Sequence, residues 1–568
     1  MNKKTFSRYF GIFKGIKLPW LLIIGCFVFS ALTMKAELQS ATLTADIVDV
    51  GKSSIDGKVL ANYILVVALA AVCNIFGNYF TYKMEETINM RVRVSLWTKI
   101  MHLPAKYYDE DNGDGLVSRV TSDAEAPSSL FSMAVSFVVC VITTVQAFIQ
   151  LFSYHKTLAM IALLIIPVTL IFCIFYGKIM FRIGVYGTVT TAGSMAYLAE
   201  RVRNFRLMKS ALAEKSESEK GDKTFKEMYK ADFLSWLMVA GYQLMSGLFS
   251  IAFIVITFVV GGQFVKSGAV TVGDLTGFYL ISGIVTLQLM QFFMNVGSVT
   301  GTFGTMQKIS RIMSAESESD NGEDVPDEQS DIIFDNVSFG YDSERPVLSG
   351  LNLRIPAGKV TAVIGENGAG KSTLFKLISR LYEPTSGKIY MGGKDIGGFR
   401  LSDWRDRFSY VFQNMPLIGG TVRENITYGL GREVGDEELI SVSKDANCYD
   451  CIAAKPKEFD EDVGLNGSNF SGGQGQCISV ARAMLRKSDY LLLDEATSNL
   501  DMISEAHLTE ALERLMKGKT TVMIAHNYAA TRGADYIIVM KDGSVQAEGT
   551  PEELLRTNEY YRKFCKTL

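Results

Sequence analysis

The sequence predicts a bundle of membrane-spanning helices followed by an α/β domain. Long apolar runs dominate the first 300 of the 568 residues, and several of them reach the ~20 residues that a helix needs to cross a bilayer. After about residue 331, short apolar runs of strand type alternate with helical segments, a pattern typical of a largely parallel sheet. We therefore expect a membrane domain at 1–313, an acidic linker at 314–330 and an α/β domain at 331–568.

The membrane domain contains six candidate spans, at about 18–48, 59–84, 128–153, 157–180, 233–265 and 273–302. Basic residues precede the first span and are frequent in the long connections 85–127 and 181–232, whereas the other connections are short. Because Lys and Arg favour cytoplasmic loops, we expect both termini in the cytoplasm. A cleaved signal peptide is the alternative for the first span, but five further spans that obey the same charge rule argue against it. Segments 84–103 and 224–236 mix charged and apolar residues at helical spacing, which indicates that the spans continue into the cytoplasm as helices.

Composition limits the partners of the chain. The net charge of −3, without a basic stripe away from the membrane flanks, argues against a nucleic-acid partner. The stretch 314–330 is acidic and contains no basic residue, so we expect a solvated linker. The eight cysteines are scattered, which predicts free thiols. Cys448 and Cys451 have the spacing of a zinc or redox pair, but no second pair accompanies them, and we expect them to pack in a helix.

A glycine-rich loop follows the apolar run 360–364. It has the G-x-x-x-x-G-K-[ST] pattern of a phosphate-binding loop and consists of Gly365, Glu366, Asn367, Gly368, Ala369, Gly370, Lys371, Ser372 and Thr373. Glycines let backbone N–H groups approach a phosphate, Lys371 adds a charge for the β- and γ-phosphates, and the Ser372 hydroxyl is placed to ligate Mg²⁺. The helix that follows directs the positive end of its dipole toward the anion. This loop predicts that the chain binds a nucleoside triphosphate with Mg²⁺.

The apolar run 490–493 ends in two adjacent carboxylates, Asp494 and Glu495. Close like charges repel each other at the end of a buried strand, so a bound cation explains the pair better than stability does. We expect Asp494 to hold the Mg²⁺ shell and Glu495 to be the catalytic group that polarises the attacking water. A second anion cradle precedes this pair, at a helix that opens with Ser471, Gly472, Gly473 and Gln474.

The Ser-Gly-Gly-Gln motif separates ATP-binding cassettes from other phosphate-loop proteins, and the domain 331–568 resembles the nucleotide-binding domain of ABC transporters. The resemblance implies that ATP lies between the phosphate loop of one domain and the signature motif of another. The chain would then be a half-transporter that needs a second half-transporter. The resemblance also implies that Tyr341 stacks on adenine, that Gln413 reaches Mg²⁺ and the attacking water, and that His526 is a second catalytic residue, in contact with the γ-phosphate.

The membrane half resembles the six-helix ABC exporters of the type IV transporter fold. Segments 102–123 and 200–214 are similar to the two intracellular loops of that family, each of which carries a short coupling helix. The resemblance implies an ATPase coupled to export of an amphipathic drug, lipid or hydrophobic peptide across a lipid bilayer, with the bacterial inner membrane as the expected location. Two alternatives stay open. One is an ATP-gated regulatory subunit without transport, against which the complete catalytic set argues, and the other is an importer of siderophore type on the same fold.

The signature side departs from the family pattern. Phe470 replaces the usual leucine, and Leu465 stands where exporters place a glutamate. Gly475 and Cys477 occupy positions where arginine is common. The phosphate-loop side is intact, and in a head-to-tail dimer the two sides serve different ATP molecules. Unequal sides therefore favour a heterodimer over a homodimer.

The cargo is the least defined part of the prediction. The last span carries uncharged aromatic, amide and thioether side chains: Phe278, Tyr279, Gln288, Met290, Gln291, Phe292, Phe293, Met294 and Asn295. Such side chains suit an amphipathic cargo, and contact with lipid or packing between helices is the alternative. Lys35 and Glu37 are stronger candidates for cargo contacts because charged side chains within a span avoid lipid. A position at the outer interface and pairing with neighbours on the helix are the alternatives for these two residues.

Overall fold

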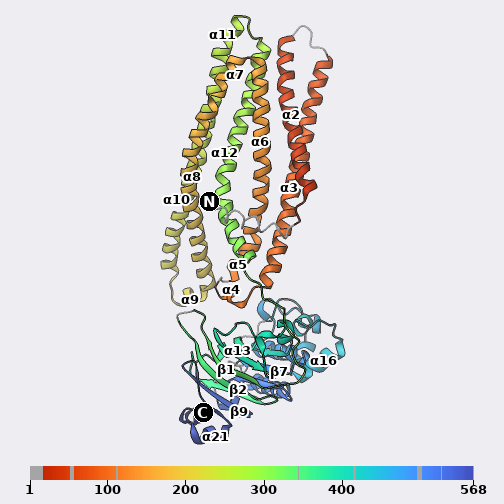
Figure 1. Cartoon of the computed structure of the whole chain (residues 1–568), viewed down its shortest axis with the longest axis vertical. Coiled ribbons are helices and arrows are strands. Elements are labelled where there is room, and N and C mark those ends of the chain that lie inside the picture. The colour runs from red at the N-terminus through yellow and green to blue at the C-terminus, as the bar shows by residue number, and fades with distance from the viewer. Residues whose placement is uncertain are drawn as a thin grey trace. The chain divides into compact units, whose positions relative to one another are not determined.

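A computed structural model describes residues 17–50, 57–110, 113–342, 345–412, 417–494, 502–525, 528–531 and 533–566. The chain divides into two compact units, whose elements are labelled in Figure 1. The first unit consists of Met1–Leu103 and Asp111–Glu316, and the second consists of Pro104–Glu110 and Ser317–Leu568. A short piece of the predicted membrane half therefore folds together with the α/β half.

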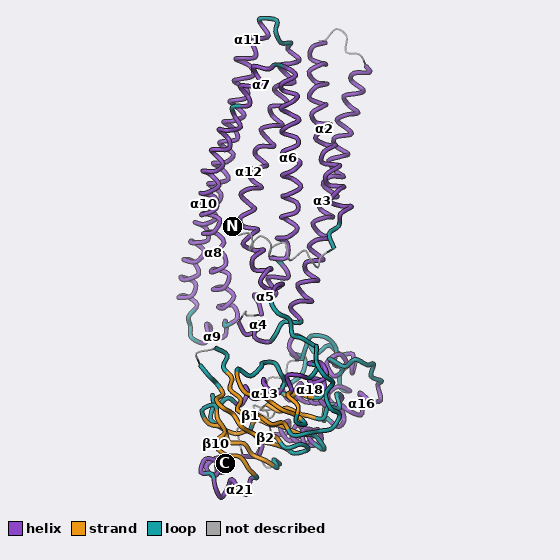
Figure 2. Tube along the Cα trace, viewed as in Figure 1, coloured by secondary structure: helices purple, strands orange, loops and turns teal. Residues whose placement is uncertain are grey.

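The first unit is built from helices, and its described residues form no strand (Figure 2). Its α-helices are α2 (Trp20–Val50), α3 (Gly57–Met101), α5 (Gly113–Thr121), α6 (Ala126–Tyr154), α7 (Lys156–Leu163), α8 (Ile165–Arg203), α9 (Phe205–Ser210), α10 (Glu214–Val255), α11 (Gly261–Lys266) and α12 (Val272–Ser314). A 3₁₀ turn, η2 (Asp123–Glu125), and a π-helical turn, η3 (Ile256–Val260), join neighbouring helices. Most of segment 84–103 lies in α3 and all of 224–236 lies in α10, which confirms the predicted helical continuation of the spans.

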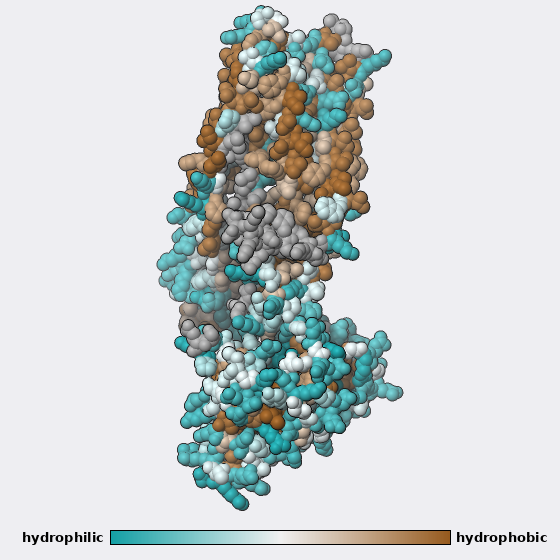
Figure 3. All heavy atoms as spheres, viewed as in Figure 1, coloured by the Kyte–Doolittle hydropathy of each residue, from teal (hydrophilic) through white to brown (hydrophobic). Residues whose placement is uncertain are grey.

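Five helices among the described residues are long and apolar enough to cross a membrane: Trp20–Val50, Gly57–Met101, Gly115–Tyr154, Glu214–Lys266 and Val272–Leu289. They coincide with the first, second, third, fifth and sixth predicted spans. The fourth predicted span, 157–180, falls on α7 and α8, where several side chains lie outside the described set, and it stays a prediction. Figure 3 shows apolar side chains gathered over this helical bundle, as expected for a surface that faces lipid.

Helices α2 and α12 pack closely against each other at the start of α12. The Asp49 carboxylate accepts hydrogen bonds from the Gly273 backbone N–H, at 2.6 Å, and from the Thr271 hydroxyl. Thr271 also forms a capping box with Asp274 at the start of α12. A Cβ atom at Gly273 would lie 2.2 Å from the backbone oxygen of Ala45. Glycine at this position is therefore what lets the two helices approach so closely.

The second unit contains two sheets. Its strands are β1 (Ile332–Phe339), β2 (Leu348–Ile355), β3 (Val360–Gly365), β4 (Ser386–Met391), β5 (Lys394–Asp395), β6 (Phe408–Val411), β7 (Tyr490–Asp494), β8 (Thr520–Ile524), β9 (Tyr536–Lys541) and β10 (Ser544–Gly549). One sheet has the order β10-β9-β3-β8-β7-β6, and every neighbouring pair in it is parallel except β10 with β9. The predicted largely parallel sheet is thus confirmed. The other sheet, β2-β1-β4-β5, is antiparallel, and the sequence pattern does not predict it.

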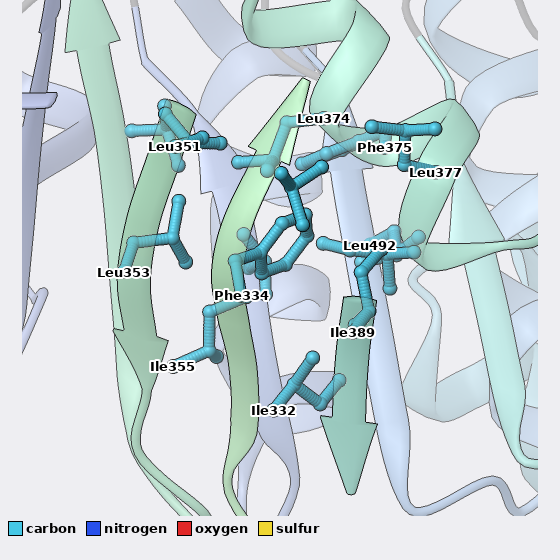
Figure 4. Packing of buried hydrophobic residues seen from close by; sticks show 14 of the residues in the cluster. Ile332, Phe334, Leu351, Leu353, Ile355, Leu374, Phe375, Leu377, Ile389 and Leu492 are labelled. Carbon is cyan, nitrogen blue, oxygen red and sulfur yellow. The ribbon is translucent and has the colours of Figure 1, made fainter. Parts of the chain in front are cut away.

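Helices surround these sheets and pack into two main apolar clusters. The helices are α4 (Ala105–Glu110), α13 (Lys371–Ile378), α14 (Leu401–Asp406), α15 (Val422–Ile426), α16 (Asp436–Asp445), α17 (Tyr449–Ala453), α18 (Gly472–Leu485), α19 (Met502–Met516), α20 (Tyr528–Thr531), α21 (Pro551–Thr557) and α22 (Glu559–Lys566). Figure 4 shows the cluster that joins the sheets, with Phe334 of β1 among Ile389 of β4, Leu492 of β7 and Leu374 of α13. Because α13 is anchored in this core, the loop that precedes it has a fixed position at the end of β3.

Residues from Ser317 onward in the acidic stretch 314–330 belong to the second unit and make ion pairs with it, while most of their acidic side chains stay exposed to solvent. Glu318 forms a two-contact ion pair with Arg405, with both N–O distances at 2.7 Å. Glu323 pairs with Lys394 at 2.6 Å, and the Asp320 carboxylate accepts the Ser402 backbone N–H at 2.7 Å. The sequence suggested solvation because the stretch lacks internal countercharges. The tertiary structure supplies those charges from the α/β domain.

The described cysteine side chains are free thiols, as predicted. Cys448 and Cys477 are buried in the cluster around α17 and α18, and Cys451 packs against it. No group of three or more His, Cys, Asp or Glu side chains within the described ranges has an arrangement that could hold a metal ion. The contacts of Cys448 and Cys451 with the apolar cluster, at the start of α17 and within it, agree with the packing interpretation of this pair.

Candidate nucleotide site

The phosphate-binding loop lies between the end of β3 and the start of α13, as the sequence predicts. Its glycines adopt backbone angles that other residues rarely tolerate, with φ of 85° at Gly368 and 95° at Gly370. A Cβ atom at Gly370 would lie 2.6 Å from a Leu348 side-chain carbon, and one at Gly365 would lie 2.2 Å from the Met540 backbone oxygen. The glycines therefore allow both the tight turn and its close contact with β9 and β2.

The Lys371 side chain is enclosed by this loop. Its residue is only 6% exposed, and its Nζ donates hydrogen bonds to the backbone oxygens of Gly365 at 2.9 Å and Glu366 at 3.0 Å. A glycine-rich loop that holds a buried positive charge fits an anionic ligand. Ser372 and Thr373 follow in the first turn of α13, where backbone N–H groups of a helix start have no partner within the helix. Loop, lysine and helix start together fit a polyphosphate.

Strand order brings the ends of β3, β6, β7 and β8 to the same edge of the sheet. Val363 of β3 pairs with Ile524 of β8, Ile524 is also paired with Asp494 of β7, and Leu493 is paired with Val411 of β6. The carboxyl ends of these four parallel strands therefore meet where the phosphate loop begins. Glu495, His526 and Gln413 come one or two residues after the described ends of these strands in the sequence and lie outside the described residues. Asp494, at the end of β7, is partly buried.

Tyr341 is half-exposed, with 43% of its surface accessible, and it has aromatic and cationic neighbours. Phe339 and Tyr382 make edge contacts with its ring at centroid distances of 5.0 and 5.3 Å. The Lys376 Nζ lies over the ring at 4.9 Å from the centroid, and the Tyr341 hydroxyl is 3.3 Å from the Thr373 hydroxyl. The exposed part of a ring held in this way suits stacking of a base.

Sequence reasoning missed the polar contacts beyond Tyr341. Lys376 also lies over the Tyr382 ring, at 5.3 Å, and its Nζ is 3.7 Å from the Asp109 carboxylate of α4. The Tyr382 hydroxyl donates a hydrogen bond to the same carboxylate. The only sequence signal was the similarity of segment 102–123 to an intracellular loop, and that similarity does not name the residues in contact.

The signature motif forms a well-capped helix start. The Ser471 hydroxyl accepts the Gln474 backbone N–H at 3.3 Å, and the Gln474 side-chain oxygen accepts the Ser471 backbone N–H at 3.0 Å. Gly472 and Gly473 complete the first turn of α18. This capping box fixes the Ser-Gly-Gly-Gln backbone and leaves the helix dipole available to an anion.

The departures from the family pattern around the signature have two different structural settings. Phe470 and Cys477 are buried in the core beside α18, and the Lys455 Nζ lies 4.9 Å from the centroid of the Phe470 ring. Burial raises the pKa of the Cys477 thiol to about 11, so this side chain is neutral at physiological pH. Leu465, in contrast, is 83% exposed. Because leucine has no charge, the side chain at this position cannot make the polar contact that a glutamate would make.

The fold and the loop define a phosphate-loop nucleotide-binding domain joined to a bundle of membrane-type helices. Residues 348–498 match the ABC transporter family, and residues 20–311 match the ABC transporter transmembrane region. The chain therefore belongs to the ABC transporter family, with the fold of the exporter-type half-transporters. It is an ATP-hydrolysing, multi-pass membrane transporter.

Named relatives resemble the chain over most of its length. A multidrug resistance ABC transporter ATP-binding and permease protein from Lactococcus lactis subsp. cremoris is 28% identical over 99% of this chain and 96% of its own length. An ATP-dependent lipid A-core flippase from Syntrophus aciditrophicus is 32% identical over 88% of this chain and 84% of its own length. The similarity thus covers both the membrane half and the nucleotide half.

Proposed function

We propose that the chain is one half of an ATP-driven exporter that moves an amphipathic solute out of the cytoplasm by alternating access. The observation that carries this proposal is the enclosed Lys371 in its glycine loop, at the same sheet edge to which β6, β7 and β8 lead. The names of the relatives, a multidrug resistance transporter and a lipid flippase, agree with an amphipathic cargo.

In this proposal each residue of the site has a separate task. Lys371 and the loop N–H groups bind the β- and γ-phosphates of ATP, and Tyr341 stacks on the adenine. Ser372, Gln413 and Asp494 supply oxygen ligands of the kind that Mg²⁺ prefers. Bound Mg²⁺ would neutralise charge on the phosphates. Glu495 accepts a proton from the attacking water, and His526 donates a hydrogen bond toward the γ-phosphate.

Replacement of the proposed base tests this assignment. Glu495→Gln should reduce ATPase turnover by about 100-fold or more, because general-base catalysis contributes that much, and should leave ATP binding intact. Glu505→Gln, at an exposed position of α19, is the matched control and should hydrolyse ATP normally. Normal solute flux by the Glu495→Gln variant would show that hydrolysis at this site does not drive transport.

We further propose that a different half-transporter completes the ATP sites. The support is the contrast between an intact phosphate loop and a signature region altered at Leu465, Phe470 and Cys477. The exposed Leu465 strengthens the contrast, since it presents no charge at the surface. Purification of the chain alone provides the test. A stable homodimer whose ATPase activity rises with cargo would exclude the requirement for another half.

The candidate cargo side chains of the first and last spans divide into packing contacts and one candidate cargo contact. The Gln288 side chain lies 3.6 Å from the Met34 sulfur, and the Asn295 amide donates to the Ser136 hydroxyl at 3.0 Å. Phe278 is buried among α2, α6 and α7 residues. These three side chains hold helices together, as the packing alternative requires.

Glu37 has a different environment. Its side chain is half-buried, and no hydrogen bond or ion pair to its carboxylate occurs within the described part of the chain, whereas Lys35 is exposed. An unpaired carboxylate within a span is a candidate contact for a cationic group of the cargo.

Ethidium, an amphipathic cation, is a suitable probe of this contact. Glu37→Gln should slow the ATP-dependent uptake of ethidium into inside-out vesicles, and Lys35→Gln should not. Uptake of ethidium, rather than its release, would also distinguish export from import.

We propose a cytoplasmic location for both termini, in a bacterial inner membrane. The support is the concentration of basic residues before the first span and in the two long connections. Epitope tags at the two ends should be digested by protease added to inside-out vesicles and should resist it in intact cells. Digestion of either tag in intact cells would reverse the orientation.

A further inference from the structure

Lys376 has three partners in the second unit, and they belong to different parts of the expected mechanism. Its ammonium lies 4.9 Å from the Tyr341 ring centroid, 5.3 Å from the Tyr382 ring centroid and 3.7 Å from the Asp109 carboxylate. Tyr341 is the predicted base-stacking residue, whereas Asp109 belongs to α4 (Ala105–Glu110). One side chain of the phosphate-loop helix α13 therefore contacts both the edge of the nucleotide site and α4.

The partners of Lys376 also contact one another, so the position of its long side chain does not depend on a single contact. The Tyr382 hydroxyl donates to the Asp109 carboxylate, and the Tyr382 ring packs edge-on against both Tyr341 and Phe339. The Lys376 side chain is 36% exposed and that of Asp109 is 57% exposed. Solvent therefore weakens the charge pair alone, and the two ring contacts supply the rest of what holds the ammonium in place.

In this geometry a nucleotide base can influence α4 through Tyr341 and Lys376, separately from the contacts of the phosphates. A base that stacks on Tyr341 restricts the motion of that ring. A restricted ring holds the Lys376 ammonium more firmly, and the ammonium in turn holds Asp109. By reciprocity of coupled binding, a firmly held α4 also favours the base.

We infer that Lys376 is a positioning residue through which the base of bound ATP, and not only its phosphates, orders α4. This inference rests on the proposed function because it takes Tyr341 as the residue that stacks on adenine. It adds a nucleotide-sensing role for Lys376, Tyr382 and Asp109, none of which belongs to the phosphate-binding motifs.

Hydrogen–deuterium exchange of α4 tests the inference on the full chain, in nanodiscs of phosphatidylethanolamine and phosphatidylglycerol. Exchange of residues 104–110 is compared with a non-hydrolysable ATP analogue and with inorganic tripolyphosphate, each with Mg²⁺ at a saturating concentration. The unchanged protein should exchange about two- to five-fold more slowly with the ATP analogue than with tripolyphosphate, the factor expected for one exposed cation–π contact. Equal exchange with the two ligands would overturn the inference.

Variants assign the effect to Lys376. Lys376→Met should bind the ATP analogue and lose the difference between the two ligands, whereas Lys376→Arg should retain it. Lys388→Met is the matched control, since Lys388 pairs with Asp395 away from Tyr341, and it should retain the difference. Asp109→Asn keeps a hydrogen-bond acceptor for Tyr382 without the charge, and it should also lose the difference. A difference that survives in both Lys376→Met and Asp109→Asn would exclude the role.

The measurement separates this inference from the proposed export activity. A chain that transports no solute would still show the base-dependent protection of α4 if Lys376 acts as inferred. A chain that exports solute but protects α4 equally with both ligands would retain the proposed function and refute the role of Lys376.

Discussion

Glu318 and Arg405 are joined by two parallel hydrogen bonds, with both N–O distances at 2.7 Å and with about a quarter of each side chain exposed. The Arg405 guanidinium also donates to the backbone oxygens of Ser379, at 3.3 Å, and Arg380, at 2.8 Å, next to the end of α13. The segment that follows α12 is thereby fixed to the helix that starts at the phosphate loop.

Glu318→Gln should therefore loosen this segment while the fold persists. The amide keeps the shape and loses the charge, which should cost about 1 kcal/mol after allowance for partial exposure. Hydrogen exchange of residues 317–325 should accelerate about five-fold, since 1 kcal/mol corresponds to that factor. Glu328→Gln, an exposed position of the same segment, should leave exchange unchanged. Equal effects of the two variants would show that the ion pair does not hold the segment.

Gly370→Ala should impair both folding and nucleotide binding. The backbone at this position has φ of 95°, and a Cβ would lie 2.6 Å from the Leu348 side chain. The left-handed conformation alone costs an alanine about 1–2 kcal/mol, so the melting temperature should fall and ATP affinity should decrease at least several-fold. Gly398→Ala is the control, because a Cβ there meets no atom within 4 Å. Wild-type affinity in Gly370→Ala would contradict the rigid loop described above.

Ser471→Ala should reduce ATPase activity more than its loss of stability explains. The substitution removes the capping hydroxyl of α18, which is worth about 1 kcal/mol, and also removes a group of the proposed second anion site. Thr550→Ala removes the same kind of capping box from α21 and should cost similar stability with normal ATPase activity. The comparison uses thermal unfolding and ATPase rates of the two variants. Equal activities would limit Ser471 to a structural role.

The thiols of the α17–α18 cluster should resist alkylation in the folded protein. Burial raises the pKa of Cys477 to about 11 and raises the pKa of Cys451 as well, so neither thiol is appreciably ionised at pH 8. Iodoacetamide should modify them slowly at pH 8 and quickly after denaturation. The stabilising effect of the neutral Cys477 is fully present below pH 9 and is lost as the pH rises through about 11. Rapid modification of the native protein at pH 8, or bound zinc in the purified protein, would favour the redox or metal alternative.

The sequence by itself determined the phosphate loop, its strand and its helix, because a glycine turn that holds a lysine depends on neighbouring residues only. It also determined the parallel character of the main sheet and the apolar spans, since both arise from local periodicity and length. The free thiols and the helical extensions of the spans followed from the same kind of local pattern.

The tertiary structure alone decided which distant segments meet. The ion pairs of the acidic stretch come from Arg405 and Lys394, and the antiparallel sheet pairs β1 with strands on either side of the phosphate loop. The Lys376 contacts join Tyr341, Tyr382 and Asp109, which are up to 273 residues apart in the chain. Such contacts depend on how whole elements pack, and a charge or ring in the sequence does not carry the identity of its remote partner.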